Sequence, residues 1–209
     1  MQPWSQPLLW PGAAVISGEW NPADKTADIT LSSGNSIATK GGVASNDGVR
    51  STTSHNSGKV YVEFPTGTRF AGSNTGVGIA TATANLATIG NVGVGGLVVL
   101  SSGGTYFNGA ALTNVGNLTG GNVIVSLAID FTNQKGWFRE NGGNWNADIL
   151  ANQNPATNTG GFSIAALFPS NAAYCVFCSN DTATAPGSST GLSPTSFTYA
   201  IPAGFVAWG

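Results

Sequence analysis

The sequence contains very few charged side chains. Seven Lys and Arg and nine Asp and Glu make up 8% of its 209 residues and leave a net charge of −2. The basic residues are scattered between Lys25 and Arg139, whereas a nucleic-acid binder needs cations clustered where phosphates will lie. We therefore expect no nucleic-acid partner. With 41% hydrophobic residues, the chain is too apolar for a disordered tail and long enough to bury a core as one globular domain.

Histidine and cysteine are almost absent, which limits metal and redox chemistry. Cys175 and Cys178 lie three residues apart in AAYCVFCS, a stretch that is typical of a strand. Residues at this spacing on a strand point to opposite faces with Cα atoms about 10 Å apart, too far for a disulfide. A zinc site would need a second ligand pair, and His55 is the only histidine. We expect two buried free thiols and no metal, and no cofactor because no Walker or dinucleotide motif occurs.

Long hydrophobic runs are also missing, since no apolar stretch approaches the ~20 residues that a membrane-spanning helix requires. The longest apolar region, around Val92 to Leu100, is interrupted by Gly93, Gly95 and Gly96. The first residues, MQPWSQPLLW, have no basic region and contain two prolines, so they do not match a secretory signal. We expect synthesis in a cytoplasm and no membrane insertion.

Recognisable catalytic arrangements are absent from the sequence. A glycoside hydrolase needs two carboxylates at one bond, and none of the three glutamates lies near another acid on one predicted strand face. GSSTG places Ser189 in the nucleophile position of a Gly-x-Ser-x-Gly pattern. However, the stretch 180–194 indicates a loop and not the strand-to-helix elbow that this chemistry needs. His55 lies in a Ser/Thr/Asn-rich turn where we expect solvent exposure. We expect no enzymatic activity.

Strand and turn signals are present along most of the sequence. Alternation places Val60, Val62 and Phe64 on one face of a strand, and the stretch 123–131 is apolar on most of both faces, which indicates a central strand. Asn-Gly at Asn108–Gly109 is typical of a tight hairpin, because both residues tolerate positive φ. The spacing predicts an all-β fold, an antiparallel two-sheet β-sandwich. Further strands are expected at 28–31, 76–81, 97–101, 135–140, 161–168, 174–179 and 196–201, and one short helix near 82–89.

The first nineteen residues form a short, extended, apolar arm that carries Trp4, Leu8, Leu9 and Trp10. Its prolines remove hydrogen-bond donors and keep the segment extended. Two interpretations remain open: the arm packs across its own sandwich as an edge strand, or it reaches a neighbouring subunit and anchors an assembly. We place the arm at residues 1–19 and the sandwich domain at residues 20–209.

Two loops carry the candidate binding residues. Trp145 lies in ENGGNWNAD between Asn144 and Asn146. An indole among amides can stack on a sugar face while the amides bond its hydroxyls, or it can anchor a protein contact. Tyr106 and Asn108, at the tip of another predicted hairpin, are further candidates. The alternative for Trp145 is a loop tryptophan folded onto the sandwich.

Asp130 is an acid in a stretch that is otherwise too apolar to be exposed. A buried or half-buried charge needs a partner. We expect Asp130 to pair with Arg50 or Lys135 in a contact that helps to specify the fold.

An ordered series of short motifs spans the chain. They are WNPADK at 20–25, RSTTSHNSGKVYVEF at 50–64, TYFNG at 105–109, LAIDFTNQKGWFRENG at 127–142 and FTYAIPAGFVAW at 197–208. Together they resemble the SPRY-like domain of many bacteriophage and phage-derived bacterial proteins. The resemblance covers residues 18 to 209 and implies a bent, concanavalin-like β-sandwich (jelly roll) whose variable loops at one end bind protein partners without catalysis.

This resemblance implies a non-catalytic virion structural or surface protein of a bacteriophage, such as a capsid decoration, head-fibre or tail accessory subunit. Its partners would be other virion proteins and copies of itself, and it would be located in the virion after synthesis in the bacterial cytoplasm. The rival hypothesis is a receptor-binding or lectin-like adhesin that grips a host glycan or protein through the loops bearing Trp145 and Tyr106. A glycan-cleaving enzyme is the third and least supported hypothesis.

Overall fold

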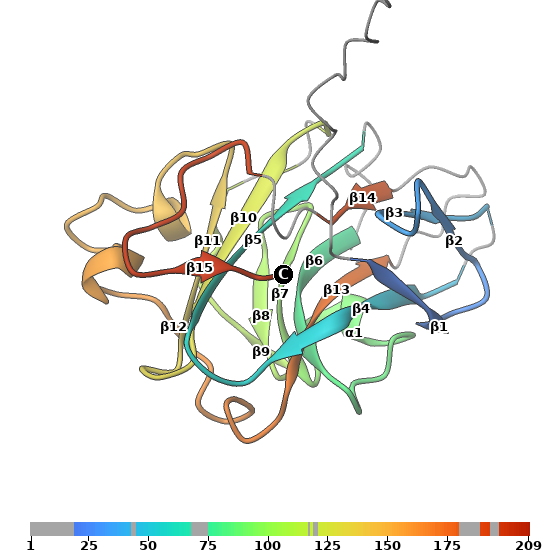
Figure 1. Ribbon diagram of the computed structural model, residues 1–209, viewed down its shortest axis with the longest axis horizontal. Helices are drawn as coiled ribbons and strands as arrows, with labels where there is room; N and C mark the ends of the chain where they lie inside the picture. Colours follow the sequence, from blue (N-terminus) through green and yellow to red (C-terminus); the bar gives the residue numbers. More distant parts are fainter. Residues whose placement is uncertain are drawn as a thin grey trace, which may run out of the picture.

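The computed structural model describes residues 19–42, 45–67, 75–116, 118, 121–179, 189–192 and 197–209 and shows two β-sheets packed face to face (Figure 1). The arm residues Trp4, Leu8, Leu9 and Trp10 lie outside this part of the chain, so the two interpretations of the arm stay predictions.

The strands of the described residues form two large sheets and one small sheet. The seven-stranded sheet has the order β1 (Trp20–Lys25), β4 (Asp47–His55), β13 (Ala173–Ser179), β6 (Thr75–Thr81), β7 (Gly96–Leu100), β8 (Thr105–Phe107) and β9 (Ala110–Ala111). The five-stranded sheet has the order β12 (Phe162–Ser163), β11 (Lys135–Glu140), β10 (Ile124–Asp130), β5 (Lys59–Pro65) and β15 (Val206–Ala207). The small sheet consists of β14 (Ser189–Gly191), β3 (Ile37–Lys40) and β2 (Ile29–Ser32). Every described pairing is antiparallel except that of β15 with β5. The predicted all-β sandwich is confirmed.

The main core lies between the two large sheets and follows the predicted alternation. Val62 of β5 is the register partner of Leu127 of β10, and both side chains are fully buried in this core. From the other sheet, β6 contributes Val77 and β13 contributes Phe177 to the same cluster. Because side chains alternate across a strand, every second residue of these strands points away from this core.

The two cysteines confirm this alternation. Cys175 lies in the core between the sheets, whereas Cys178 lies in a separate cluster on the outer face of the seven-stranded sheet. Both thiols are free and buried, as predicted. Burial raises the pKa of Cys178 to about 12 and the pKa of Cys175 well above its ordinary value. Neither thiol is therefore a nucleophile at neutral pH.

Both outer faces of the sandwich are covered by further parts of the chain. On the seven-stranded sheet, Leu86 and Ile89 from the segment between β6 and β7 pack on Val98 and Val176. On the five-stranded sheet, the C-terminal segment 197–208, red in Figure 1, runs alongside the strands. This second cover explains why β10 is apolar on both faces, and β10 is a central strand as predicted. Within the described residues, no helix has the length and apolar character needed to cross a membrane.

The predicted short helix and loop are partly corrected. The helix α1 covers Ile89–Val92, whereas the expected position was 82–89. The Asn85 side chain accepts the Ala87 backbone N–H at 2.9 Å, and such a local bond competes with helix formation. Of the predicted loop 180–194, residues 189–191 form β14, because Ser189 finds a ladder partner in Thr39 of β3. Residues 180–188 and 193–194 lie outside the described part of the chain.

The predicted partners of Asp130 are wrong. Asp130 is fully buried and pairs with Lys59, with 3.1 Å between the ammonium nitrogen and Oδ2. Lys59 and Lys135 are both register partners of Asp130, on β5 and β11, but the Lys135 ammonium donates to the Asn158 carbonyl. Arg50 lies in the other sheet and pairs with Asp24. The sequence indicates that Asp130 needs a cationic partner. Which lysine serves is decided by the strand register and by the loop that carries the Asn158 carbonyl, which binds Lys135.

Two buried carboxyl groups make the stability of the fold depend on acid pH. Burial raises the pKa of Asp130, but hydrogen bonds from Asn133 and the Lys59 ammonium outweigh burial, so that its pKa lies below the ordinary value. For Asp47, hydrogen bonds from Ser45 and Thr26 and the nearby Lys40 ammonium likewise outweigh burial and lower the pKa. Each group stabilises the fold above its unfolded-state pKa of about 3.9, and this stabilisation is lost as pH falls through the folded-state pKa.

We therefore expect the free energy of unfolding to fall as pH is lowered below about 4, in urea titrations between pH 7 and pH 2. In the Asp130→Asn variant, whose side chain carries no titratable proton, we expect this fall to be smaller than in the wild type, because the pKa of Asp130 lies below its ordinary value in the fold. The same pH dependence in both proteins would contradict the assignment of Asp130.

Candidate functional site

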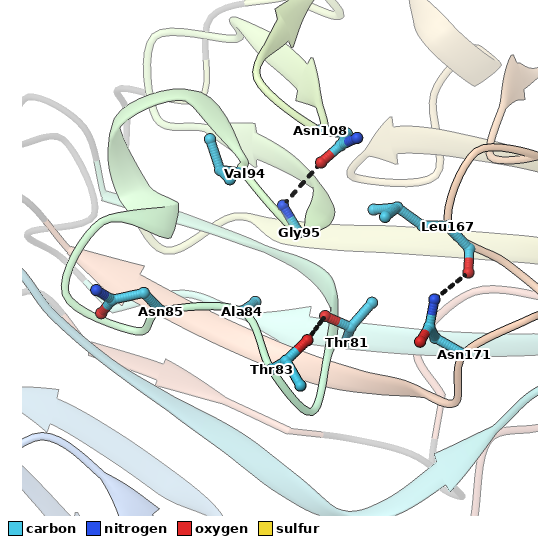
Figure 2. Close-up of a pocket in the computed structure, with 9 residues that line it drawn as sticks. All are labelled: Thr81, Thr83, Ala84, Asn85, Val94, Gly95, Asn108, Leu167 and Asn171. Carbon is cyan, nitrogen blue, oxygen red and sulfur yellow. Dashed lines mark hydrogen bonds between the residues drawn. The ribbon is translucent and has the colours of Figure 1, made fainter.

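Four segments of the chain surround a pocket of about 320 Å³ (Figure 2). The first is the stretch that leaves β6, the second is the stretch that enters β7, and the third precedes β13; the β8–β9 turn completes the wall. The lining residues are Thr81, Thr83, Ala84, Asn85, Val94, Gly95, Asn108, Leu167 and Asn171.

The β8–β9 hairpin positions Asn108 at the pocket. Asn108 has φ 47° and Gly109 has φ 88°, the positive values that the Asn-Gly pair predicted for a tight turn. Asn108 Oδ1 accepts the backbone N–H of Gly95 at 3.2 Å, and this bond ties the turn to the segment before β7. Gly95 itself has φ 81°, and a Cβ atom there would lie 2.7 Å from the Ala84 Cβ, so only glycine fits between the two walls.

The opposite walls are held by local bonds between neutral groups. The hydroxyls of Thr81 and Thr83 lie 3.3 Å apart, and the Asn171 amide donates to the Leu167 carbonyl at 2.8 Å (Figure 2). Among the described lining residues none is ionisable and none is aromatic. The site therefore suits hydroxyl or amide groups of a ligand beside a small aliphatic group, and the lining residues that the structure describes offer no group for acid–base chemistry.

The predicted binding residues do not form one site. Asn108 lines the pocket, while Tyr106, half-buried, packs against the outer cluster of the seven-stranded sheet. Trp145 begins the short helix η1 (Trp145–Ala147) and packs on the outer face of the five-stranded sheet, so it belongs to the other layer of the sandwich. Asn144 is exposed, whereas Asn146 is buried. That they bind a ligand stays a prediction.

Trp145 is part of a packed cluster. Its side chain is only 5% exposed, and the Arg139 guanidinium lies 4.3 Å from the centre of its ring. Arg139 also donates to the Tyr61 hydroxyl and the Ala200 carbonyl, at 3.2 Å and 3.0 Å. Asn146 accepts the backbone N–H of Phe138 at 2.9 Å, which fixes the loop to β11. This geometry is the alternative considered for Trp145, a loop tryptophan folded onto the sandwich.

The other polar groups singled out in the sequence have structural contacts. Ser189 lies in a strand and not at a strand-to-helix turn. His55 is half-buried, which corrects the expected exposure, because its Nε2 contacts the Trp208 carbonyl and its ring packs edge-on against the Trp208 ring. Within the part of the chain that the structure describes, no three His, Cys, Asp or Glu side chains gather closely enough to hold a metal ion.

Most of the pocket residues were not expected from the sequence. The Asn-Gly turn indicated Asn108, but no local pattern sets apart Thr83, Val94 or Asn171. They come from segments up to 88 positions apart in the chain, between Thr83 and Asn171, and only the packing of the sheet brings them together.

Solved structures with the same fold include SPRY domains. The SPRY domain of human HERC1 matches with a TM-score of 0.62 at 15% identity, over 83% of this chain and 96% of that chain. The TRIM65 PSpry domain matches with a TM-score of 0.56 at 13% identity, over 84% and 88%, and a human SPRY domain with 0.55 at 13%, over 79% and 94%. Comparisons of the sequence with protein-family models and with curated proteins find no match. The protein therefore has a SPRY-like β-sandwich fold.

Proposed function

We propose that the protein is a non-catalytic binding module that acts through protein–protein contacts made at the pocket. The SPRY-like fold supports this proposal as an analogy only, since a fold does not define an activity by itself. The observation that carries it is the chemistry of the pocket, where exposed Thr83, Asn108 and Asn171 surround the exposed aliphatic side chain of Val94. An uncharged polypeptide segment offers both the amide groups and the small aliphatic side chains that fit this lining.

The pocket favours a protein over a glycan as the partner. Glycan recognition draws on aromatic rings that stack on sugar faces, and no aromatic side chain is among the described lining residues. Trp145, the indole that motivated the adhesin hypothesis, is covered by Arg139 on one side and packed in a cluster with Tyr61 and Trp137. The receptor-binding or glycan-binding adhesin is therefore the less supported candidate.

The biological context that we propose is the bacteriophage virion. The motifs at 20–25 and 50–64 resemble phage-type SPRY-like domains, and the low content of charged residues suits a dense assembly because little charge keeps neighbouring copies apart. In this proposal the protein is a capsid decoration, head-fibre or tail accessory subunit that is made in the bacterial cytoplasm. Its partners are other virion proteins and copies of itself, and the arm residues Trp4, Leu8, Leu9 and Trp10 contribute to assembly.

A single charge in the pocket tests this proposal. Val94 is 48% exposed, so Val94→Glu should leave the melting temperature unchanged while it lowers partner binding at least about tenfold, because an unpaired carboxylate would be buried in the contact. Val206→Glu is the matched control, since Val206 is 62% exposed on β15 of the other sheet. The measurement is the fraction of tagged protein that co-sediments with phage particles after production in the same cells.

Three outcomes decide between the candidates. Loss of co-sedimentation for Val94→Glu but not for Val206→Glu supports the proposal. Equal co-sedimentation of both variants would exclude the pocket as the contact. A wild-type protein that never sediments with particles, but binds a glycan array, would favour the adhesin.

A further inference from the structure

Arg50 is a buried cation whose contacts reach the wall of the pocket. It lies in β4 and is 3% exposed. Its Nε donates to the Thr81 carbonyl at 2.9 Å, and its Nη2 donates to the Ala84 carbonyl. Its Nη1 donates to both carboxylate oxygens of Asp24 in β1, at 2.8 Å and 3.0 Å. All three guanidinium nitrogens are thus used, two of them on the chain segment that leaves β6.

The two carbonyls that Arg50 holds belong to residues that line the pocket, Thr81 and Ala84 (Figure 2). The segment between them has few bonds of its own: the Ala84 N–H donates to the Thr81 carbonyl at a long 3.3 Å. Thr81 in turn donates its N–H to the Gly95 carbonyl at 2.9 Å, which links this wall to the segment before β7. Two of the three guanidinium nitrogens of Arg50 are therefore bonded to this wall, whose Thr81 end is also paired with Ala173 of β13.

The segment also rests closely on the sheet. A Cβ atom on Gly48 of β4 would lie 3.0 Å from the Leu86 carbonyl oxygen, closer than nine in ten real Cβ contacts. Leu86 follows Ala84 by two residues and packs on the same outer face. The hydrogen bonds from Arg50 and the close packing of Leu86 over Gly48 thus both constrain the chain segment that leaves β6.

The carboxylate of Asp24 neutralises the charge of Arg50. A buried guanidinium is costly unless an opposite charge and hydrogen bonds compensate it. Asp24 is 38% exposed, so its substitution does not create a cavity in the core. The flat guanidinium of Arg50 reaches two carbonyls and a carboxylate at once, whereas a lysine ammonium is a single point charge.

We propose that Asp24 and Arg50 are positioning residues for the pocket, which hold its wall at Thr81–Ala84 in the arrangement that receives the partner. This inference rests on the proposed function for its biological meaning, but the position of the wall can be measured without a partner. It also gives a physical role to two of the sequence motifs, because Asp24 belongs to the motif at 20–25 and Arg50 begins the motif at 50–64.

The test is backbone amide hydrogen exchange of the unliganded full-length protein. In Asp24→Asn and in Arg50→Lys, we expect the amides of residues 81–95 to exchange at least about tenfold faster than in the wild type. The Thr81 amide, which donates to the Gly95 carbonyl, should be among them. The amides of β10 and β5 should keep their wild-type rates. Asp24→Glu, which retains the carboxylate, should restore slow exchange. Asp148→Asn, in a surface loop on the other layer of the sandwich, is the control and should change neither region.

Exchange that rises equally in residues 81–95 and in β10 would show that the pair only stabilises the whole fold, and it would overturn the proposal. Unchanged exchange at 81–95 in Asp24→Asn would overturn it as well, even if Arg50→Lys fails to fold. The partner is examined separately by co-sedimentation of Asp24→Asn with phage particles. Faster exchange with unchanged co-sedimentation would retain the positioning role and would contradict the pocket as the binding site.

Discussion

Trp145→Ala is expected to lower the free energy of unfolding by about 3–5 kcal/mol, the range measured when a large buried aromatic residue is truncated. The substitution removes an indole that is 5% exposed and leaves a cavity beside Trp137 and Phe205. It also removes the ring over which the Arg139 guanidinium lies. For a domain of this size the melting temperature should fall by about 6–20 °C, as measured by thermal unfolding followed by circular dichroism.

Asn144→Ala is the control for this prediction, because Asn144 is the exposed neighbour of Trp145 and should leave the melting temperature within about 1–2 °C of the wild type. A different outcome would contradict this prediction. A Trp145→Ala protein with an unchanged melting temperature and weaker binding to cells or to a glycan array would show that the indole faces a ligand, as the adhesin hypothesis requires.

Glu63→Gln should release the C-terminal segment from the five-stranded sheet. The buried Glu63 carboxylate accepts the backbone N–H groups of Thr198 and Tyr199, at 2.8 Å and 2.9 Å, and the Tyr61 hydroxyl at 2.7 Å. Burial and then this carboxylate raise the pKa of Tyr61 to about 12, so the phenol stays protonated and donates at neutral pH. A glutamine has one accepting oxygen, and its NH₂ group would face a donor.

We expect Glu63→Gln to cost about 3 kcal/mol of stability, because at least one buried donor loses its acceptor. Hydrogen exchange of the Thr198 and Tyr199 amides should become faster than exchange in β10. Glu19→Gln removes the same charge from an exposed position and should change neither quantity. Wild-type protection of both amides in Glu63→Gln would contradict the role given to this carboxylate.

Much of the fold could be predicted from the sequence, because the signals are local. Alternation along residues 60–64 identified which side chains of β5 face the core, and the structure confirms it for Val60, Val62 and Phe64. The spacing of Cys175 and Cys178 placed the two thiols on opposite faces for the same reason. The Asn-Gly pair at 108–109 indicated the hairpin turn that carries a pocket residue.

Two of the errors concern contacts between segments that are distant in the chain. Asp130 was assigned the wrong cation, because the choice among Lys59, Lys135 and Arg50 depends on strand register and on what else each cation can reach. His55 was expected to be exposed, but the C-terminal segment brings Trp208 against it. Neither neighbour can be inferred from the residues beside Asp130 or His55 in the sequence.

The sequence by itself determined the class of fold, the positions of central strands such as β5, β6, β10 and β13, the free thiols and the shortage of charge, because side-chain alternation and turn preference are properties of neighbouring residues. Only the tertiary structure decided that the indole of Trp145 is covered, that Asp24 pairs with Arg50, and that uncharged side chains from separate loops share one pocket. These features depend on how two sheets and their covering segments pack, and packing brings together residues whose contact no local sequence pattern indicates.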